Sequence, residues 1–244
     1  MESLMYRYDT HVHTMESSRC GKVTGADMAR YYKEKGYAGI IVTDHFLNGS
    51  SRATDEMSWE EKVDVLMSGY ESARAEGERI GLSVFFGFEF NFDMTEFLCY
   101  GLDREWLLAH KDCHLLDFRE FSQLAHESGA FIVHAHPFRQ RRYIKTIRLI
   151  PDCVDAVEVM NAAHPDLSRF DERAEWYADE FGLYKTGGSD NHVVNQKYLG
   201  GIETDTPISS ILDYISTVKE RSFKIFKFEN PDFDGLASHG PVKI

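Results

Sequence analysis

Short apolar runs alternate with amphipathic stretches along most of the chain. The apolar runs predict strands at 6–12, 38–43, 83–90, 97–101, 130–135, 154–160 and 183–188, with Phe223–Phe228 as a further candidate. Apolar positions recur at helical spacing in five stretches between them: Ala26–Lys35, Trp59 to about Arg79, Phe118–Glu127, Leu167–Phe181 and Ser209 to about Arg221. Strands that alternate with helices are typical of a parallel sheet, so the pattern predicts an α/β fold.

The helix ends carry their usual signals. Thr24 and Ser58 stand where N-cap residues are expected, and a glycine follows the end of four predicted helices. This rhythm continues over 244 residues without a linker, a repeat or a low-complexity tract, and 43% of the residues are hydrophobic. We therefore expect a single domain over residues 1–244, with Glu229–Ile244 as a surface-wrapping or loose tail.

Composition narrows the functional classes. The net charge of −13 argues against stable nucleic-acid binding, which needs clustered Lys and Arg. No apolar run approaches the roughly 20 residues of a membrane span, and the first residues do not resemble a secretory signal. The chain has four widely spaced cysteines that form no C-x-x-C pair: Cys20, Cys99, Cys113 and Cys153. We therefore expect neither disulfides nor a structural zinc site. We also expect a cytoplasmic location.

Metal-ligand side chains stand at the ends of six predicted strands. The segments are Tyr8–His13, Ile40–His45, Val84–Glu89, Phe131–His136, Val157–Asn161 and Gly187–His192. In a parallel barrel the carboxyl ends of the strands open onto one face, where such residues converge. The sequence therefore predicts one site that holds several metal ions.

His11 and His13 are two residues apart, so in a strand they point to the same face, as two ligands of one ion must. Asp9 either orients a ligand or caps a turn. At Asp44-His45 the histidine is the better ligand, with the aspartate as its brace. Glu89 lies among aromatic residues, where an unpaired carboxylate is costly to bury, so it suits a bridge between two ions.

His134 and His136 repeat the spacing of the first pair, and the more common arrangement is that one binds metal while the other supports it. Asp190 and His192 follow a Gly-Gly-Ser that permits close backbone approach. The strand-end residues Glu158 and Asn161 could equally well anchor a neighbouring loop or contact a metal. His164 could approach the rim of the site. Surface or packing roles are expected for the other histidines: His110, His114, His126 and His239.

The ligand inventory is imidazole and carboxylate without thiolate, which suits two or three divalent ions of Zn, Mn or Fe. Neither a nucleophile elbow nor a phosphate-binding glycine loop is present.

Together the segments resemble the motifs of the PHP (polymerase and histidinol phosphatase) superfamily of metal-dependent phosphoesterases. The similarity spans residues 9–192 and rests on Asp9–Thr14, Thr43–His45, Gly87–Glu89, His134–Pro137 and Gly188–His192. It implies a distorted (β/α)7 TIM-like barrel with two or three metals. It also implies that His45 contributes to the outermost metal, that His134 is only a neighbour, and that six residues are ligands: His11, His13, Glu89, His136, Asp190 and His192.

Two positions depart from the pattern of this superfamily. Its members usually supply another His or Asp five or six residues after the first His pair, whereas this chain has Met15–Cys20, in which Glu16 is the only carboxylate. We therefore expect Glu16 to complete the third metal site. Histidinol phosphatases also place a histidine soon after the strand that follows the glutamate, and here Glu96 or Asp103 stands in that region.

The resemblance favours a histidinol-phosphatase-like enzyme that hydrolyses a small-molecule phosphate monoester by a metal-bridged hydroxide. The residues expected to act on the substrate are His11, His13, Glu89 and Asp190. Arginines of the loops, chiefly Arg139, Arg142 and Arg19, would bind the phosphate, while the rim loops at 46–57 and 138–150 reveal no specific leaving group. The alternatives are a nuclease or nucleotide phosphodiesterase, an amidohydrolase and a non-catalytic metal-binding module.

Overall fold

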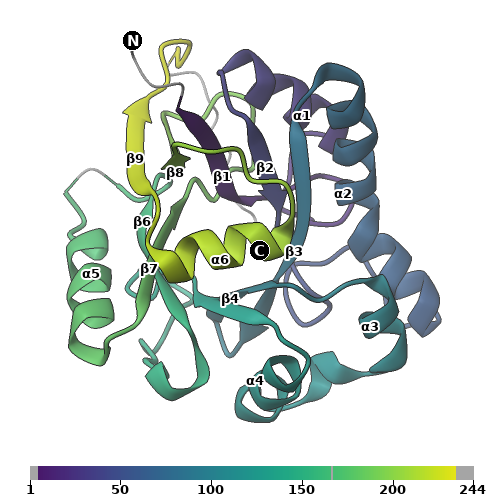
Figure 1. Cartoon of the computed structure of the whole chain (residues 1–244). Helices are drawn as coiled ribbons and strands as arrows, with labels where there is room; N and C mark the ends of the chain where they lie inside the picture. The colour runs from purple at the N-terminus through teal and green to yellow at the C-terminus, as the bar shows by residue number, and fades with distance from the viewer. Residues whose placement is uncertain (1–4, 166, 235–244) are drawn as a thin grey trace.

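The computed structural model describes residues 5–165 and 167–234 (Figure 1). Nine strands in this part of the chain form one sheet, in the order β7-β6-β5-β4-β3-β2-β1-β8-β9. Their bounds are β1 Tyr6–Val12, β2 Gly39–Val42, β3 Ser83–Phe92, β4 Thr95–Tyr100, β5 Phe131–His134, β6 Ala156–Asn161, β7 Tyr184–Gly188, β8 Tyr198–Thr204 and β9 Lys224–Glu229. The helices are α1 Gly25–Glu34, α2 Trp59–Ile80, α3 Arg104–Ala109, α4 Phe118–Glu127, α5 Phe170–Phe181 and α6 Ile211–Glu220, with short 3₁₀ turns at Cys113–Leu115 and Pro151–Cys153.

All seven predicted strands are present, and β9 occupies the further candidate segment. The α/β class and the distorted barrel are therefore confirmed. The strand β8 and the short helix α3 were not predicted. The sequence of β8, Tyr198–Thr204, has two consecutive glycines at its centre, and glycine weakens a strand signal.

Two expected helices begin later than the apolar pattern suggested. Helix α5 starts at Phe170, after a left-handed residue at Arg169, and α6 starts after Ser210, whose side chain accepts a hydrogen bond from the Asp213 amide. The expected N-caps at Thr24 and Ser58 are present, and Ser58 forms a full capping box with Glu61.

Six strands run parallel, and β4 is reversed between two of them. It pairs antiparallel with both β3 and β5, because β3 turns back directly through Asp93 and Met94, which have φ values of 52° and 66°. No helix separates β3 from β4, so the strict strand-helix alternation is interrupted here. As a result, β4 brings its amino end, with Glu96, to the edge where the parallel strands present their carboxyl ends.

Strand β1 closes the barrel by taking two different neighbours along its length. Its first half, Tyr6–Tyr8, pairs antiparallel with β8. Beyond that point β1 pairs with the residues that follow β7. The His13 amide donates to the Asn191 carbonyl at 2.9 Å, and the Asn191 amide donates to the His11 carbonyl at 3.3 Å. The ends of β1 and β7 are thereby joined, and their polar side chains come together.

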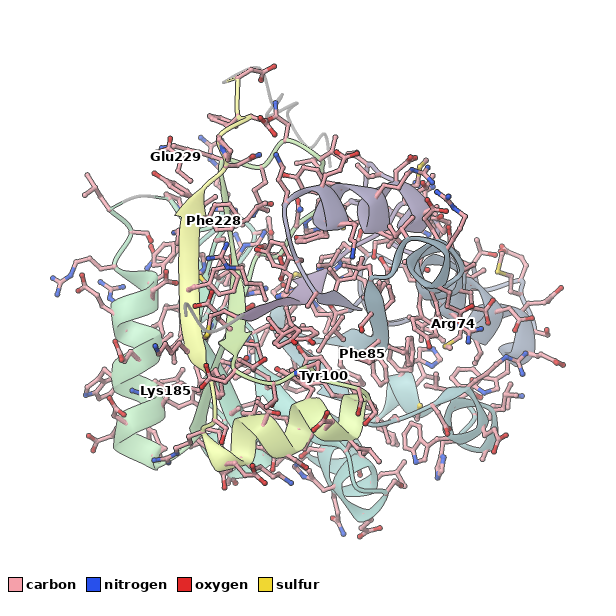
Figure 2. All side chains as sticks on the ribbon, turned by 45° about the horizontal axis from the view of Figure 1, so that its top comes forward. Arg74, Phe85, Tyr100, Lys185, Phe228 and Glu229 are labelled. Atoms are coloured by element: carbon pink, nitrogen blue, oxygen red, sulfur yellow. The ribbon has the colours of Figure 1, made fainter. Side chains whose placement is uncertain are left out.

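Helix α6 covers the opposite end of the barrel (Figure 1). Its Tyr214 packs edge-to-face on Tyr100 with ring centroids 5.1 Å apart, and both belong to an apolar cluster that includes Tyr8 and Phe131 near the amino ends of their strands. Figure 2 shows Tyr100 beside α6, and Lys185 of β7 beside α5, where its amine lies 2.8 Å from Asp179. Helix α6 thus leaves the carboxyl end of the barrel uncovered.

The predicted tail begins on the surface of the domain. Asn230 is buried, and its carboxamide donates to the Tyr31 hydroxyl at 3.1 Å and to the Gln196 carbonyl at 3.0 Å. Residues 235–244 of that tail lie outside the described residues. Within the described ranges, no helix has both the length and the apolar character that crossing a membrane requires.

Candidate metal centre

Four donor side chains converge at the carboxyl ends of β1, β3 and β7. The Nε2 atoms of His11 and His13 are 3.0 Å apart. Glu89 lies 3.3 Å from His11 and 3.6 Å from His13, and Asp190 Oδ1 lies 3.7 Å and 3.5 Å from the same two nitrogens. Ligands about 2.1 Å from a tetrahedral ion are separated by about 3.4 Å. One donor atom each of His11, His13 and Glu89 lies within 4.8 Å of the other two, and Asp190 lies beside both imidazoles, so we call these four residues the inner cluster.

The chain around the inner cluster explains why these side chains meet. Phe88 and Phe90 are buried in the aromatic core that also contains Phe46 and Phe121. Because side chains alternate along a strand, Glu89 points the opposite way, into the barrel. Gly188 of β7 is needed for the approach of β1, since a Cβ there would lie 2.5 Å from His11 Cβ.

Glu89 also connects the inner cluster to a second group of donors. Its Oε1 lies 3.3 Å from His136 Nε2, and the same nitrogen lies 3.5 Å from Glu96 Oε2. Its Oε2 lies 2.8 Å from His45 Nδ1, yet that buried nitrogen has no partner in hydrogen-bonding geometry. A buried nitrogen beside two carboxylates but not bonded to them fits a ligand of an ion. Between the two candidates for the missing family ligand, Glu96 is therefore the one at the site.

Asp103, the other candidate, serves a local role. It is the N-cap of α3, where its carboxylate accepts from the Trp106 amide at 2.8 Å. The sequence signal for Glu96 is its place at the start of a reversed strand, which could be recognised only once the direction of β4 was known.

Two of these donors stand in backbone conformations that L-residues seldom adopt. His136 has φ 29° directly after β5, and Asp190 has φ 50° directly after β7. Residues in left-handed conformations cost free energy and are found preferentially at functional sites. Here the turn out of each strand directs a donor side chain into the barrel.

Electrostatics in the inner cluster favour charged carboxylates. Burial alone would raise the pKa of Glu89, but His45 and His11 outweigh it and hold the pKa well below its usual range. The pKa of Asp190 is likewise lowered against the effect of burial, mainly by His11, His13 and Arg139. These carboxylates are ionised and ready to bind cations.

A third group, which we call the outer site, consists of Cys20, His45 and His192. One donor atom from each, together with one from His13, lies within 4.8 Å of all the others. Burial alone would raise the pKa of the Cys20 thiol, but its contacts with His192 and His45 lower it to about 6. The sequence predicts donors without a thiol, whereas in the structure the Cys20 sulfur lies among these imidazoles.

Glu16 does not stand at this position. Both of its carboxylate oxygens accept a hydrogen bond from the Gly25 amide, each at 3.0 Å, at the first residue of α1. The predicted role of Glu16 as a ligand is thus contradicted, because the positive end of the helix dipole and a free amide hold its side chain elsewhere. The stretch Met15–Cys20 did contain the residue at the site, but as a thiol rather than a carboxylate.

Glu158 and Asp9 support the first strand. Glu158 is fully buried, and its oxygens accept from His11 Nδ1 at 2.9 Å, the His136 amide at 3.0 Å and Asn161 Nδ2 at 2.9 Å. Through these bonds Glu158 orients His11 and the turn at His136, and it also forms a group of possible metal donors with the same two histidines. Asp9 accepts from the amides of His11 and Ser189, which ties β1 to β7, and burial raises its pKa to about 6.

Asp44 and His134 lie elsewhere than predicted. Asp44 does not brace the His45 ring: it accepts from the Thr14 amide and hydroxyl and from the Ser18 hydroxyl at 2.6–2.7 Å, and so fixes the loop that carries Cys20. His134 faces away from the donors, between Phe97 and Tyr177. Burial lowers its pKa to about 3, so it is a neutral core residue.

One arginine reaches the donors. Arg139 Nη1 donates to Asp190 Oδ2 at 3.1 Å, whereas the predicted phosphate-binding residues Arg142 and Arg19 are exposed. Arg139 also lines a small pocket whose other walls include Glu96, His136 and Ile147. The rim loop at 138–150 therefore builds a pocket directly against the donors.

His164 approaches the donors from the other side. Its ring is 6.5 Å from that of His136, centroid to centroid, and its Nδ1 lies 2.6 Å from Asp171 Oδ1. The opposite ring nitrogen, Nε2, is buried without a hydrogen-bond partner. His164 thus resembles a histidine that is oriented through Nδ1 so that its Nε2 can exchange a proton.

Comparison with known proteins was made at the level of sequence and of structure. No protein-family model and no curated protein matches the chain. Among solved structures, a two-domain protein from Bacteroides vulgatus that contains a predicted PHP-like metal-dependent phosphoesterase is similar with a TM-score of 0.67 and 17% identity, over 91% of this chain and 65% of that one. The chain thus spans about two thirds of that protein.

Two further solved structures are similar. A protein from Bifidobacterium adolescentis assigned as a metal-dependent phosphoesterase has a TM-score of 0.52 and 18% identity, over 77% of this chain and 88% of that one. An amidohydrolase from Chromobacterium violaceum with bound sulfate has a TM-score of 0.53 and 18% identity, over 76% and 87%. The chain therefore has the fold of the PHP-like metal-dependent phosphoesterases, as its sequence motifs indicate.

Proposed function

We propose that this protein is a metal-dependent phosphoesterase that hydrolyses a small-molecule phosphate monoester. The observation that carries this proposal is the convergence of His11, His13, Glu89 and Asp190 at ligand spacing beside Arg139. Divalent ions bound there would lower the pKa of a coordinated water and neutralise charge on the phosphoryl oxygens. The solved structures of the same fold that are described as metal-dependent phosphoesterases support this class of reaction.

The residues around the inner cluster have distinct tasks in this proposal. Glu89 is shared between the inner cluster and the pair His136 and Glu96, so it would hold two ions at a fixed distance. Glu158 keeps His11 in the tautomer whose Nε2 lone pair faces the cluster, because its carboxylate accepts the Nδ1 proton. A preorganised arrangement of this kind avoids reorganisation during the reaction.

Arg139 is the residue best placed to bind the phosphoryl group. It is half-buried and already directed at the cluster by Asp190, and its Nε is buried without a hydrogen-bond partner. A guanidinium with unused donors beside a cation site suits an anion with several oxygens. Charge from Asp190 and Glu96 outweighs burial and raises the pKa of Arg139, so the guanidinium remains charged.

The pocket beside Arg139 offers apolar contacts to a leaving group. Ile144 and Ile147 line it together with Glu96 and His136. The departing oxygen needs a proton, and His164, held through Nδ1 by Asp171, is the nearby imidazole with a free Nε2.

A substrate panel tests this proposal. The protein is freed of metal, reloaded with Mn²⁺ or Zn²⁺, and offered phosphomonoesters, a phosphodiester and an amide. We expect metal-dependent release of phosphate from the monoesters, lost in Asp190→Asn. Preferred cleavage of the diester would favour a phosphodiesterase, cleavage of the amide an amidohydrolase, and no turnover of any substrate a metal-binding module.

A further inference from the structure

The outer site differs from the other donor groups in its chemistry. The inner cluster and the pair His136 and Glu96 are rich in carboxylates, whereas the outer site offers one thiol and two imidazoles. Carboxylate-rich sites suit hard ions such as Mn²⁺, and thiolate with imidazole suits softer ions such as Zn²⁺. The chain thus presents two kinds of metal environment side by side.

The residues of the outer site each have a donor atom that remains available to an ion. The Nδ1 atom of His192 lies 2.9 Å from the Asp190 carbonyl, so it carries the proton and its Nε2 keeps a free lone pair. The Cys20 sulfur, one nitrogen of His45 and one nitrogen of His192 lie within 4.8 Å of one another. His13 is excluded from the set because its Nε2 already faces Glu89 and Asp190.

A hydrogen-bond network holds the loop of Cys20 against the strand of His45. The Ser18 hydroxyl donates to Asp44 Oδ1 at 2.6 Å and accepts from the His45 amide at 3.0 Å. The next amide, of Arg19, donates to the Ser50 carbonyl at 2.8 Å. Cys20 therefore faces the imidazoles because the backbone on both sides of the site is bonded together, which is the preorganisation that a metal site requires.

We propose that Cys20, His45 and His192 form a separate nitrogen and sulfur site for a thiophilic divalent ion such as Zn²⁺. Binding forms one metal–sulfur and two metal–nitrogen bonds, and any proton held on the sulfur or on the two binding nitrogens goes to solvent. This inference deepens the proposed function, since the ion would lie beside the inner cluster through His45, whose Nδ1 is 2.8 Å from Glu89. It does not require phosphoesterase activity, and its tests do not measure turnover.

The first test uses Co²⁺ as a spectroscopic probe of the full-length metal-free protein. Thiolate coordination gives a near-ultraviolet charge-transfer band that imidazole and carboxylate ligands do not give. We expect this band in the wild type and in the matched control Cys153→Ser, and its loss in Cys20→Ser. Zn²⁺ should remove the band at lower concentration than Mn²⁺. A wild type without the band, or a Cys20→Ser variant that keeps it, would overturn the proposal.

The second test needs no variant and so remains decisive if Cys20→Ser fails to fold. Wild-type protein is treated with iodoacetamide with and without one equivalent of Zn²⁺, and each cysteine is followed by peptide mass spectrometry. We expect Zn²⁺ to slow alkylation of Cys20 at least tenfold, while the buried thiols Cys99, Cys113 and Cys153 serve as internal controls. Equal alkylation of Cys20 in both samples would contradict the site even if the phosphoesterase activity is found.

Discussion

The Nε2 atoms of His11 and His13 face each other at 3.0 Å at the carboxyl end of β1. Burial alone would lower the pKa of His11, but Glu158 and Asp190 outweigh it and raise the pKa well above its ordinary value. The pKa of His13 is lowered by burial and by the charge of His192. In the metal-free protein the pair therefore holds a proton on His11, and a bound ion must displace it.

This relationship predicts that metal binding releases protons. Because the raised pKa keeps His11 protonated above the ordinary histidine value of about 6.5, affinity should rise as the pH increases above about 6.5, by up to about tenfold per pH unit for each proton released. Calorimetric titration of metal in two buffers of different ionisation enthalpy measures the release. The variant His126→Gln, outside the cluster, should behave as wild type. Affinity that does not change with pH would contradict this reading.

Glu16 should contribute to stability and not to metal binding. Its carboxylate accepts from the Gly25 amide at the start of α1, so Glu16→Ala should lower the free energy of unfolding by about 1 kcal/mol. Urea unfolding of the metal-free protein measures this loss, with Glu34→Ala at the exposed end of the same helix as control. Loss of a metal equivalent in Glu16→Ala would restore Glu16 as a ligand.

Much of the site could be predicted from the sequence because the periodicity of strands determines where their last residues point. Six strand-end segments share one face of the barrel, so His11, His13, Glu89, His136, Asp190 and His192 come together without knowledge of the loops. The polar residues of irregular segments were not predictable in this way. Cys20 lies in a loop whose path depends on tertiary hydrogen bonds to Asp44 and Ser50.

Two further points could not be decided from the sequence for the same kind of reason. Asp44 and His45 are adjacent, and the strand pattern alone does not decide whether the carboxylate turns to the imidazole or to the Thr14 loop. The reversed strand β4 placed Glu96 at the site, although a uniform strand-helix alternation would have put its other end there. In both cases a contact between segments distant in sequence determined the outcome.

Arg139 should matter for the substrate, and Arg142 should not. Removal of one charge-assisted contact to a phosphoryl group costs about 2–3 kcal/mol, so Arg139→Ala should lower kcat/KM about 30- to 150-fold while retaining bound metal. Arg142→Ala, a change in the same loop at an exposed position, is the control. Equal losses in the two variants would point to a general effect of loop charge and not to a bound phosphate.

His164 should help only when the leaving group needs a proton. We expect His164→Asn to lower kcat about 10²-fold for an alkyl phosphate and to change it little for p-nitrophenyl phosphate, whose leaving oxygen is already stable as an anion. The comparison of the two substrates in one variant separates this role from a structural one. A similar fall with both substrates would show that His164 acts through the packing around His136.

The central claim is that the donors at the carboxyl end of the barrel form a centre for several ions, and anomalous scattering from crystals soaked in Mn²⁺ or Zn²⁺ tests it most directly. We predict one peak among His11, His13, Glu89 and Asp190, a second between Glu89, Glu96 and His136, and, with Zn²⁺, a third at Cys20, His45 and His192. A map without a peak among His11, His13, Glu89 and Asp190, from crystals of protein that binds metal in solution, would contradict the account.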